Sequence, residues 1–326
     1  MIVSTRPVSR SRKKKIGSKS HATKPDLYQV ITDKVIKLLK EGTVPWQHPW
    51  NQYGLARNYA TGHIYTGINA FLLNFLPNFD VPFYLTYKQA QALGGQVRKG
   101  AKAETVYFFK TLYKDADGKN VTAQQVARLR ASKESVRAIP MPRTFHLFNV
   151  ADIDGIDFTI PELKARPVAP IEVCDDFLNE LQSVPPIVHQ DLNEAYYHPV
   201  TDVINMPPLP RFHSAAAYYH VLFHETIHST GHASRLNRPG ITLPAEQRKQ
   251  RSQIYAFEEL VAELGAVYLS QHAGISVSPV ASAEQLENTA AYIDGYLQRL
   301  REDKRFLFKA SSQAQKAVSF LLGAPA

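Results

Sequence analysis

The run FHETIHSTGH, residues 223–232, restricts the fold of this 326-residue chain more than any other feature. His224, Glu225 and His228 form the pattern H-E-x-x-H. On an α-helix, this spacing puts both imidazoles on one face about one turn apart, as two ligands of a tetrahedral zinc ion require. Glu225, beside the first histidine, would then act on metal-bound water. The pattern therefore predicts a metal-binding helix, provided that a third ligand lies nearby.

The residues around this pattern favour a buried helix. Ser214 is a good N-cap, and the segment AAAYYHVLF that follows it is apolar enough to be buried. Gly231 suits the C-terminal cap. We therefore expect a helix from Ser214 to about Thr230, with the two histidines in its last turns.

The third ligand is expected to be a carboxylate. In metzincins a third histidine follows six residues after the second, but here Ser234 occupies that position. No methionine follows the histidines either, which excludes the Met-turn of that class. A second helix, predicted over residues 254–272, instead carries three glutamates among apolar residues: Glu258, Glu259 and Glu263.

Two of these glutamates share a helix face. Glu259 and Glu263 are four residues apart, whereas Glu258 points about 100° away from them. Two acids on an otherwise apolar face are costly unless a cation compensates them. We predict that Glu259 is the ligand and that Glu263 is the acceptor that orients a histidine, although the two roles could be exchanged. Zn²⁺ is the expected ion, and Mn²⁺ or another divalent ion would also suit these ligands.

The basic charge of the chain is concentrated at its N-terminus. The net charge is +9, and residues 1–24 contain eight Lys or Arg residues and no Asp or Glu. We predict that residues 1–25 form a flexible arm that could anchor on phosphates, with a solvated tail as the alternative. The chain lacks a stretch of about 18 apolar residues and a secretory signal, so we expect a cytoplasmic protein without a membrane partner. The single cysteine, Cys174, excludes an internal disulfide and is expected to be a buried structural thiol.

The order of the remaining elements predicts two domains and an α+β fold. A small α+β domain is expected over residues 26–160, with a helix that starts after Asp26 and another capped near Thr86. Within it, residues 115–140 are a polar insertion, and RTFHLFNVADIDG returns as a paired strand. The proline-containing segment 161–170 is the predicted linker. The mainly helical second domain, residues 171–326, should contain a helix over 171–183, an extended pair around IVHQDL and AYYHPVTDVINMP, and helices near 283–302 and 311–322.

These segments together resemble a known family. The N-terminal runs PWQHPW, NYATGHIYTGIN, YLTYKQAQALGGQVRKGAKAETVYFFK and FNVADIDG are similar to the single-stranded-DNA-binding domain of ArdC-type antirestriction proteins, which is also fused to plasmid TraC-type primases. FHETIHSTGH and YAFEELVAELGAVYL are similar to the zincin-like metallopeptidase domain of that family. The resemblance implies a mobile-element protein that binds single-stranded DNA and protects incoming DNA from restriction. It also implies that His224, His228 and a glutamate of the EELVAE segment bind the metal, with Glu225 as the catalytic residue.

The N-terminal half has residues suited to such a role. Single strands are held by basic grooves with aromatic platforms. The candidate contacts are the aromatic and basic side chains Trp46, Trp50, Arg57, Lys88, Lys99 and Lys102. The competing interpretation makes the aromatics core residues and the lysines a solvated surface.

Three functions remain open at this point. The first is an antirestriction protein with a zinc-dependent, gluzincin-like peptidase site, whose partners would be single-stranded DNA and a protein substrate or restriction enzyme. The second is a metalloprotease that acts on DNA-bound proteins. The third is a DNA-binding protein in which the metal is structural and no reaction occurs.

Overall fold

The computed structural model describes residues 26–45, 55–77, 79, 81–160, 170–191, 194–212, 214–244, 247, 252–275 and 294–324. The predicted arm of residues 1–25 lies outside these ranges, as do Trp46, Trp50 and residues 161–169 of the predicted linker. The described part contains both helices and sheets in each half, which confirms the α+β class.

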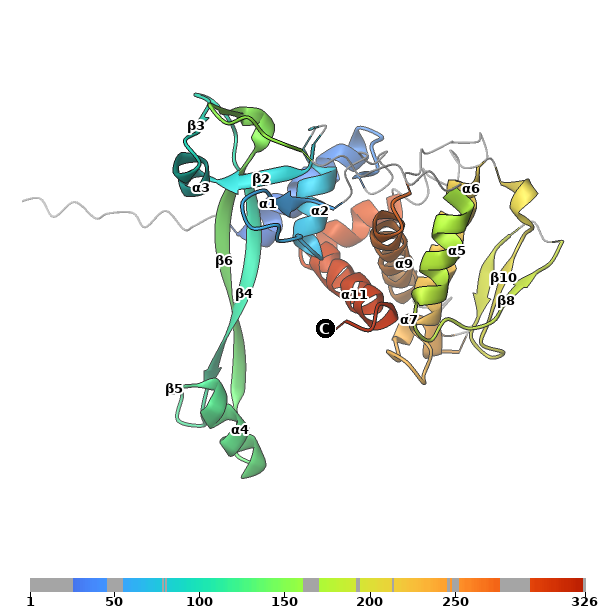
Figure 1. Cartoon of the computed structure of the whole chain (residues 1–326). Helices are drawn as coiled ribbons and strands as arrows, with labels where there is room; N and C mark the ends of the chain where they lie inside the picture. Colours follow the sequence, from blue (N-terminus) through green and yellow to red (C-terminus); the bar gives the residue numbers. More distant parts are fainter. Residues whose placement is uncertain are drawn as a thin grey trace, which may run out of the picture.

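The N-terminal half is built on a five-stranded sheet of order β1-β2-β6-β4-β5 (Figure 1). Its strands are β1 (Arg57–Asn58), β2 (Phe83–Thr86), β4 (Glu104–Lys114), β5 (Asn120–Val121) and β6 (Arg137–Asn149). A separate pair is formed by β3 (Gln96–Val97) and β7 (Ile153–Asp154). The helices of this half are α1 (Leu27–Lys40), α2 (Ile68–Phe75), α3 (Tyr87–Ala92) and α4 (Ala123–Ala131). Only β1 and β2 pair in parallel; the other pairs are antiparallel.

The helix boundaries of this half follow the predicted caps. The Asp26 carboxylate accepts a hydrogen bond from Tyr28 N and starts α1, and Gly42 after the helix has a φ of +77°. Thr86 starts α3 with a capping box, in which its hydroxyl and the Gln89 side chain each bond the other's backbone N–H. Local hydrogen-bonding chemistry therefore fixes where both helices begin.

Strands β4 and β6 form a long two-stranded ribbon that projects from the sheet, with β5 and α4 at its tip (Figure 1). The register runs from Glu104 opposite Leu147 to Lys114 opposite Arg137. Strand β6 thus starts at Arg137, six residues before the returning strand expected from the sequence. The part of β6 that contains Pro140 and Pro142 pairs only with β4 among the described strands, because β2 pairs with residues 147–149, and proline is tolerated at such an edge.

The C-terminal half is mainly helical, as expected. Its helices are α5 (Pro170–Glu180), α6 (Ala215–Ser229), α7 (Pro239–Thr242), α9 (Ser252–His272) and α11 (Phe306–Leu321), and residues 294–302 are also helical. Ser214 caps α6 as predicted, by accepting from Ala217 N. The last helix begins at Phe306, earlier than the predicted 311, and the predicted helical residues 283–293 lie outside the described ranges.

The extended segments of this half form three strands rather than a pair. The order is β8-β10-β9, with β8 (Ile187–His189), β9 (Tyr196–His198) and β10 (Val203–Met206). The segment AYYHPVTDVINMP folds into a hairpin, because its HPVTD stretch turns the chain and places Asp202 at a φ of +51°. Strand β8 then pairs in parallel with β10, which leaves β9 at the edge of the sheet.

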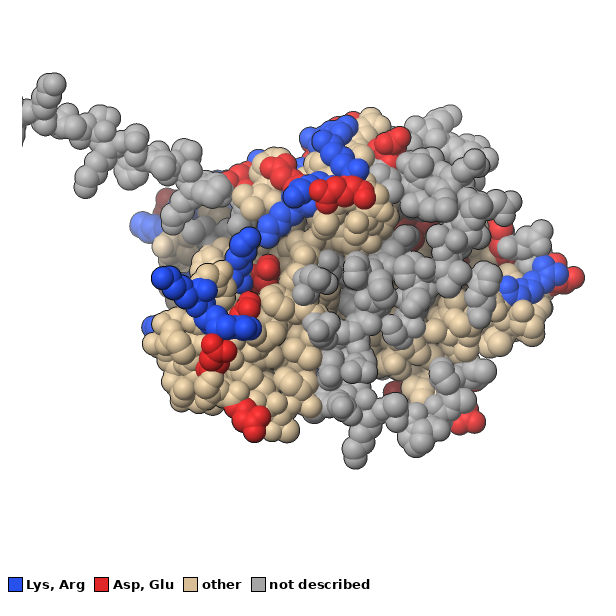
Figure 2. All heavy atoms as spheres, turned by 90° about the horizontal axis from the view of Figure 1, so that it is seen from above, with Lys and Arg blue, Asp and Glu red and all other residues tan. Residues whose placement is uncertain are grey.

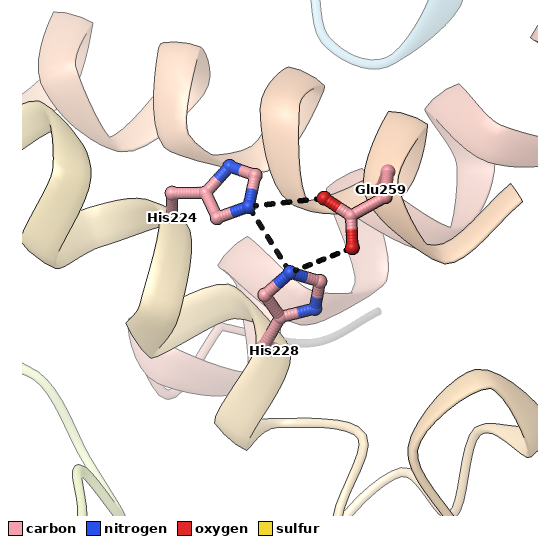
Figure 3. Close-up of side chains that lie close together, drawn as sticks. All are labelled: His224, His228 and Glu259. Carbon is pink, nitrogen blue, oxygen red and sulfur yellow. Dashed lines mark hydrogen bonds and ion pairs between the residues drawn. The ribbon is translucent and has the colours of Figure 1, made fainter. Parts of the chain in front are cut away.

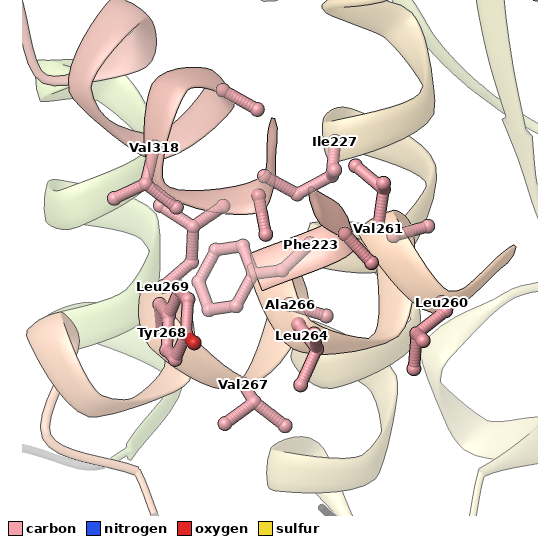
Figure 4. Close-up of a cluster of buried hydrophobic side chains, with 14 of the residues drawn as sticks. Phe223, Ile227, Leu260, Val261, Leu264, Ala266, Val267, Tyr268, Leu269 and Val318 are labelled. Carbon is pink, nitrogen blue, oxygen red and sulfur yellow. The ribbon is translucent and has the colours of Figure 1, made fainter. Parts of the chain in front are cut away.

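Helices α6 and α9 pack closely in the core of the C-terminal half. Figure 4 shows Phe223 and Ile227 of α6 among apolar side chains of α9, including Leu264. A Cβ atom at Gly265 would lie 2.7 Å from Ile227, so glycine permits this close approach. The contact brings the histidine-bearing face of α6 against the glutamate-bearing face of α9.

One hydrophobic cluster joins the two halves of the molecule. It contains α1 residues such as Ile31 and Val35 together with residues of α6, α9 and α11. The Tyr28 ring packs edge-on against Phe308 at 4.7 Å, and the Tyr268 hydroxyl donates to Gly67 O at 3.1 Å. Figure 1 shows α1 and α2 beside α11. The two halves therefore share a core.

Two smaller expectations concern burial and membranes. Cys174 is fully buried on α5, and burial raises the pKa of its thiol to about 12, which confirms a structural thiol. No helix within the described ranges has an apolar stretch long enough to span a bilayer.

Candidate metal centre

His224, His228 and Glu259 converge between α6 and α9 (Figure 3). The two Nε2 atoms of the histidines are 3.0 Å apart. The Glu259 carboxylate lies 3.5 Å from Nε2 of His224 and 3.6 Å from Nε2 of His228. Three potential ligand atoms therefore face a common point. The two imidazoles lie on one face of α6, as their i, i+4 spacing predicted.

The separations match those of a tetrahedral ion. Bonds of about 2.0–2.2 Å from zinc to nitrogen and oxygen place neighbouring ligand atoms about 3.3–3.6 Å apart. The two imidazole-to-carboxylate separations fall in this range, and the two imidazole nitrogens are slightly closer. Two nitrogens and one carboxylate also leave a fourth position open, as in catalytic rather than structural zinc sites. The residues present fit a divalent ion.

Glu258 orients the second histidine. Nδ1 of His228 lies 3.2 Å from the Glu258 carboxylate. When Nδ1 donates to that carboxylate, Nε2 presents its lone pair toward Glu259 and His224, as a metal ligand must. Glu258 is itself held by Arg238, whose Nε and Nη2 donate to it at 3.0 and 2.6 Å. Both side chains of this ion pair are at least 95% buried.

Glu258 was not predicted to contact a histidine, yet it is the glutamate that contacts Nδ1 of His228. Glu258 was not predicted to be part of the site, because its side chain leaves α9 on a different face from that of Glu259. That face is where Arg238 lies, just before α7. A buried acid on an apolar helix was the available signal, since such a group requires a partner. The partner could not be found from local sequence, because Arg238 precedes Glu258 by 20 residues.

Glu263 lies one turn beyond Glu259 and faces the same cluster. Burial raises the pKa of Glu263, and the neighbouring charge of Glu259 acts in the same direction. His224 and His228 act in the opposite direction. The charge of Glu263 thus interacts with the charges of the predicted ligands. That Glu263 accepts a hydrogen bond that orients a histidine stays a prediction.

The charges of the cluster strongly favour a cation. Despite burial, hydrogen bonds to Glu258 and Glu259 raise the pKa of His228 to about 10. Burial opposes ionisation of Glu259 too, but the two histidines hold the pKa of its carboxyl well below its usual value. Without a metal, the buried carboxylates therefore draw protons onto the imidazoles, and a divalent ion would replace those protons.

Glu225 points from α6 toward the edge strand β9. Its carboxylate accepts a hydrogen bond of 2.7 Å from the backbone N–H of Tyr197 and is largely buried. Because this N–H is directed at Glu225, the outer edge of β9 faces the region of the metal cluster. Strand β9 was not predicted to be part of the site.

The predicted DNA contacts that the structure describes lie on β1, on α3 and in the segment between β3 and β4. Lys88, Lys99 and Lys102 are exposed, whereas Arg57 is half-buried with its guanidinium 5.6 Å from the centre of the Phe83 ring. Figure 2 shows basic side chains forming a band over the N-terminal side of the molecule, with acidic groups among them. Trp46 and Trp50 lie outside the described ranges, and the six DNA contacts stay a prediction.

Two family models match the chain. The N-terminal domain of the anti-restriction factor ArdC matches residues 25–148, and a zincin-like metallopeptidase model matches residues 174–313. The two matches are separated by residues 149–173, a segment that contains the predicted linker at 161–170.

Several relatives cover most of the chain. A DNA primase TraC of Escherichia coli is 33% identical over 92% of this chain, which spans only 27% of that protein. The uncharacterised protein y4eC of Sinorhizobium fredii is 32% identical, with 92% of each chain covered. The chain thus spans about a quarter of the length of this primase and nearly all of y4eC.

Solved structures agree with these matches. The metal-free crystal structure of the antirestriction protein ArdC from plasmid R388 aligns with a TM-score of 0.67 at 33% identity, covering 91% of this chain and 96% of that one. The Mn(II)-bound structure of that protein aligns with a TM-score of 0.66 at 32% identity, covering 91% and 97%. Together with the geometry of the three ligands, the Mn(II)-bound relative indicates a divalent metal at this centre.

Proposed function

The chain belongs to the ArdC family of antirestriction proteins, and we propose that it protects incoming DNA by binding single strands and by cleaving peptide bonds at a zinc site. The observation that carries the enzymatic part is the convergence of His224, His228 and Glu259 beside Glu225. The similar ArdC protein from plasmid R388 supports an origin on a mobile element, and action in the cytoplasm is part of the proposal.

The side chains of the site can divide the work of peptide hydrolysis. A divalent ion bound by the three ligands would supply Lewis acidity that polarises a carbonyl and acidifies water. Glu225 is the proposed general base, which accepts the proton of the attacking water and passes it to the leaving amine. When a divalent ion replaces the proton on Nε2 of His228, the contact of Nδ1 with Glu258 would hold the ring with its remaining proton on Nδ1. The Arg238 guanidinium in turn holds Glu258 in place.

Strand β9 supports a peptide as the substrate class. It lies at the edge of its sheet and pairs only with β10 among the described strands. An extended peptide can add to such an edge through main-chain hydrogen bonds. A peptide bound there would pass close to Glu225, which already contacts Tyr197 N of this strand.

The variant Glu225→Gln tests the peptidase proposal. The amide oxygen can still accept from Tyr197 N, so the fold and the three metal ligands remain, but the amide cannot act as a base. We expect unchanged metal content and DNA affinity, with loss of cleavage of a DNA-bound protein substrate and loss of protection in transfers into restricting cells. Glu180→Gln on α5, an exposed glutamate, is the matched control.

The result separates the functions considered above. Full protection by Glu225→Gln would eliminate proteolysis as the cause of antirestriction. Cleavage lost but protection retained would favour a protease whose antirestriction role is incidental. If the unaltered protein cleaves nothing and Glu225→Gln protects fully, the metal is structural.

Metal analysis tests the proposed zinc. We expect one zinc ion per chain in protein purified without chelator, and its loss in His228→Ala, measured by elemental analysis. His198→Ala on β9 is the control, because this half-buried histidine bonds Thr201 and is not part of the ligand cluster. Stoichiometric manganese with no zinc would replace the proposed ion, and an unchanged metal content in His228→Ala would refute the site.

The N-terminal half is proposed to bind single-stranded DNA through exposed basic side chains and the aromatic residues Trp46 and Trp50. Arg57 is included in this proposal as a residue at the surface of the sheet. We expect tighter binding of single than of double strands, with a steep salt dependence that falls when residues 1–24 are removed. The reason is that each phosphate contact releases a counterion, which contributes about 0.7 to the slope of log K against log salt.

A matched pair of triple variants tests these contacts. Replacing Lys88, Lys99 and Lys102 with alanine should reduce the magnitude of the slope by about 2. The control replaces three exposed lysines of α1 with alanine and so removes the same amount of charge: Lys34, Lys37 and Lys40. Equal slopes for the two triple variants would show that only the net charge matters.

A further inference from the structure

A cavity of about 380 Å³ opens on the N-terminal half where the ribbon joins the sheet. It lies between strands β4 and β6, the start of α3 and the loop after β1. Its size is within the range of small-ligand sites, about 300–1,000 Å³. Of the predicted DNA contacts that the structure describes, namely Arg57, Lys88, Lys99 and Lys102, none lines it. The lining residues used below are Asn58, His63, Tyr65, Gln89, Phe108 and Phe145. Arg143, which pairs with Phe108 across the ribbon, also lines the cavity.

Two phenylalanines form an exposed aromatic wall. Phe108 is 38% and Phe145 is 45% exposed, and their ring centres are 5.3 Å apart in an edge-on arrangement. The His63 ring centre lies 6.4 Å from that of Phe108 and 5.2 Å from that of Tyr65. Exposed rings gathered at the mouth of a cavity offer a flat apolar partner a place to stack.

The floor of the cavity is a rigid amide network. Asn58 Oδ1 accepts from the backbone N–H groups of Ala60 and Thr61, and Gln89 Oε1 accepts from Thr86 N at 2.9 Å. These backbone donors fix which end of each amide is the oxygen. Asn58 Nδ2 then donates to Gln89 Oε1 at 3.0 Å, so the two amides hold each other. The network is therefore pre-organised before a ligand arrives.

This arrangement leaves hydrogen-bond donors directed at the cavity. Gln89 Nε2 donates one hydrogen to Asn58 Oδ1, and its second has no acceptor within the described part of the chain. Tyr65 accepts from Asn58, and burial raises the pKa of its phenol, so it keeps its proton. No described residue accepts that proton. A ligand with carbonyl or ring-nitrogen acceptors would satisfy both donors.

The ribbon beside the cavity is positively charged. Arg143 is exposed and forms no ion pair with any residue that the structure describes. The register of β4 and β6 places Lys114 and Arg137 on the same side of the ribbon as Arg143 and the two phenylalanines. The acid that the register places on this side, Glu104, lies at the base of the ribbon, and burial raises its pKa. A polyanion could thus follow the ribbon away from the cavity.

We infer that this cavity binds one unstacked base of single-stranded DNA. Phe145 stacks on the base and Phe108 meets the edge of the base, since the two rings are nearly perpendicular. Gln89 and Tyr65 donate to acceptors of the base, and Arg143 contacts the adjacent phosphate. The inference rests on the proposed single-strand binding and assigns it a specific base-binding pocket. Thymine offers a carbonyl oxygen to each of the two donors, whereas cytosine and guanine offer one carbonyl oxygen and adenine offers only ring nitrogens.

Fluorescence anisotropy with two probes of equal length tests this pocket: a thymidine oligonucleotide and the corresponding abasic oligomer. In Phe145→Ala, affinity for the thymidine strand should fall about 5- to 150-fold, the range for loss of stacking on one base. Affinity for the abasic strand should not change, because it has no base to stack. Tyr87→Ala, which removes a ring of similar exposure outside the cavity, is the control and should bind both probes like the unaltered protein.

Photocrosslinking gives an independent measurement. An oligonucleotide with one 5-iodouracil is irradiated with the full-length protein, and crosslinked peptides are mapped by mass spectrometry. We expect crosslinks at Phe108, Phe145, His63 or Tyr65, which are lost in Phe145→Ala.

The outcomes distinguish the pocket from the broader proposal. If Phe145→Ala binds the thymidine strand with unaltered affinity, or loses affinity equally for the abasic strand, the pocket is refuted while single-strand binding stands. If the unaltered protein binds neither probe, both proposals fail.

Discussion

The metal centre and the ribbon cavity represent two opposite ways to build a site. The candidate metal centre takes its three proposed ligands from two continuous helices and buries them beside charged partners. The cavity takes its lining from several strands and turns between Asn58 and Leu147, and leaves its aromatic rings exposed. One site depends on buried charge held by ion pairs, and the other on a surface held in shape by neutral hydrogen bonds.

The difference determines how each region should respond to substitution. A buried charge that loses its partner costs far more than an exposed charge, because water cannot replace the partner. A surface aromatic ring adds little to folding but can dominate binding. We therefore expect changes near the metal centre to affect stability, and changes at the cavity to affect only ligand affinity.

The largest expected effect is that of Arg238→Met. It leaves Glu258 buried with only His228 as a charged contact, so the free energy of unfolding should fall by about 3–5 kcal/mol. Urea unfolding of metal-free protein measures the change. Arg143→Met at the exposed cavity is the matched control and should stay within about 0.5 kcal/mol of the unaltered protein. Similar midpoints for the two variants would contradict the contrast between the regions.

A medium effect is expected from Gly265→Ala, which probes the spacing of α6 and α9. The new methyl group would press on Ile227, and such overpacking costs about 1–3 kcal/mol. Metal affinity should fall as well, because the same helices carry the histidines and Glu259. Thermal melts with and without zinc measure both effects, and Ile227→Val in the same chain should restore part of each.

The control for this variant is Gly295→Ala. Position 295 is helical and a Cβ atom there would meet nothing within 4 Å. It should stabilise the protein by about 0.5–1 kcal/mol through helix propensity. Destabilisation by both alanines would show that Gly265 is not special.

The smallest effect is expected from shortening the ribbon. Replacing residues 115–136 by an Asn-Gly turn removes β5 and α4 but keeps the register of β4 and β6. The free energy of unfolding should change by less than about 1 kcal/mol, since the tip is remote from the shared core. Metal content should not change. A loss of bound metal would show that the ribbon and the metal centre are coupled.

Elements governed by local rules could be predicted from the sequence. Caps at Asp26, Thr86 and Ser214 start their helices as expected, because a single side chain satisfies the exposed N–H groups there. The start of β6 at Arg137 was not predicted, because residues 137–140 fell within the expected polar insertion and their pairing with β4 cannot be deduced before the partner strand is known. The β9–β10 hairpin was missed for a related reason, since its turn lies within a run that reads as extended.

The candidate metal centre and the cavity also differ in how far local sequence rules could predict them. Histidines four residues apart must share a helix face, so His224 and His228 could be placed together from their spacing alone. Glu258 could not be assigned, since its role depends on Arg238 from another segment. The cavity gave no signal in the sequence, because Asn58, Gln89 and Phe145 meet only through the register of the sheet and the loop that follows β1.

Helix α9 links the candidate metal centre in the C-terminal half to helix α2 in the N-terminal half. It carries Glu259 near one end, and nine residues later it carries Tyr268, whose hydroxyl bonds Gly67 at the start of α2. Nine residues of helix span about 14 Å and behave as a stiff rod. Any tilt of that rod that adjusts Glu259 to an ion of different radius must therefore also displace the anchor of α2 beneath the DNA-binding half.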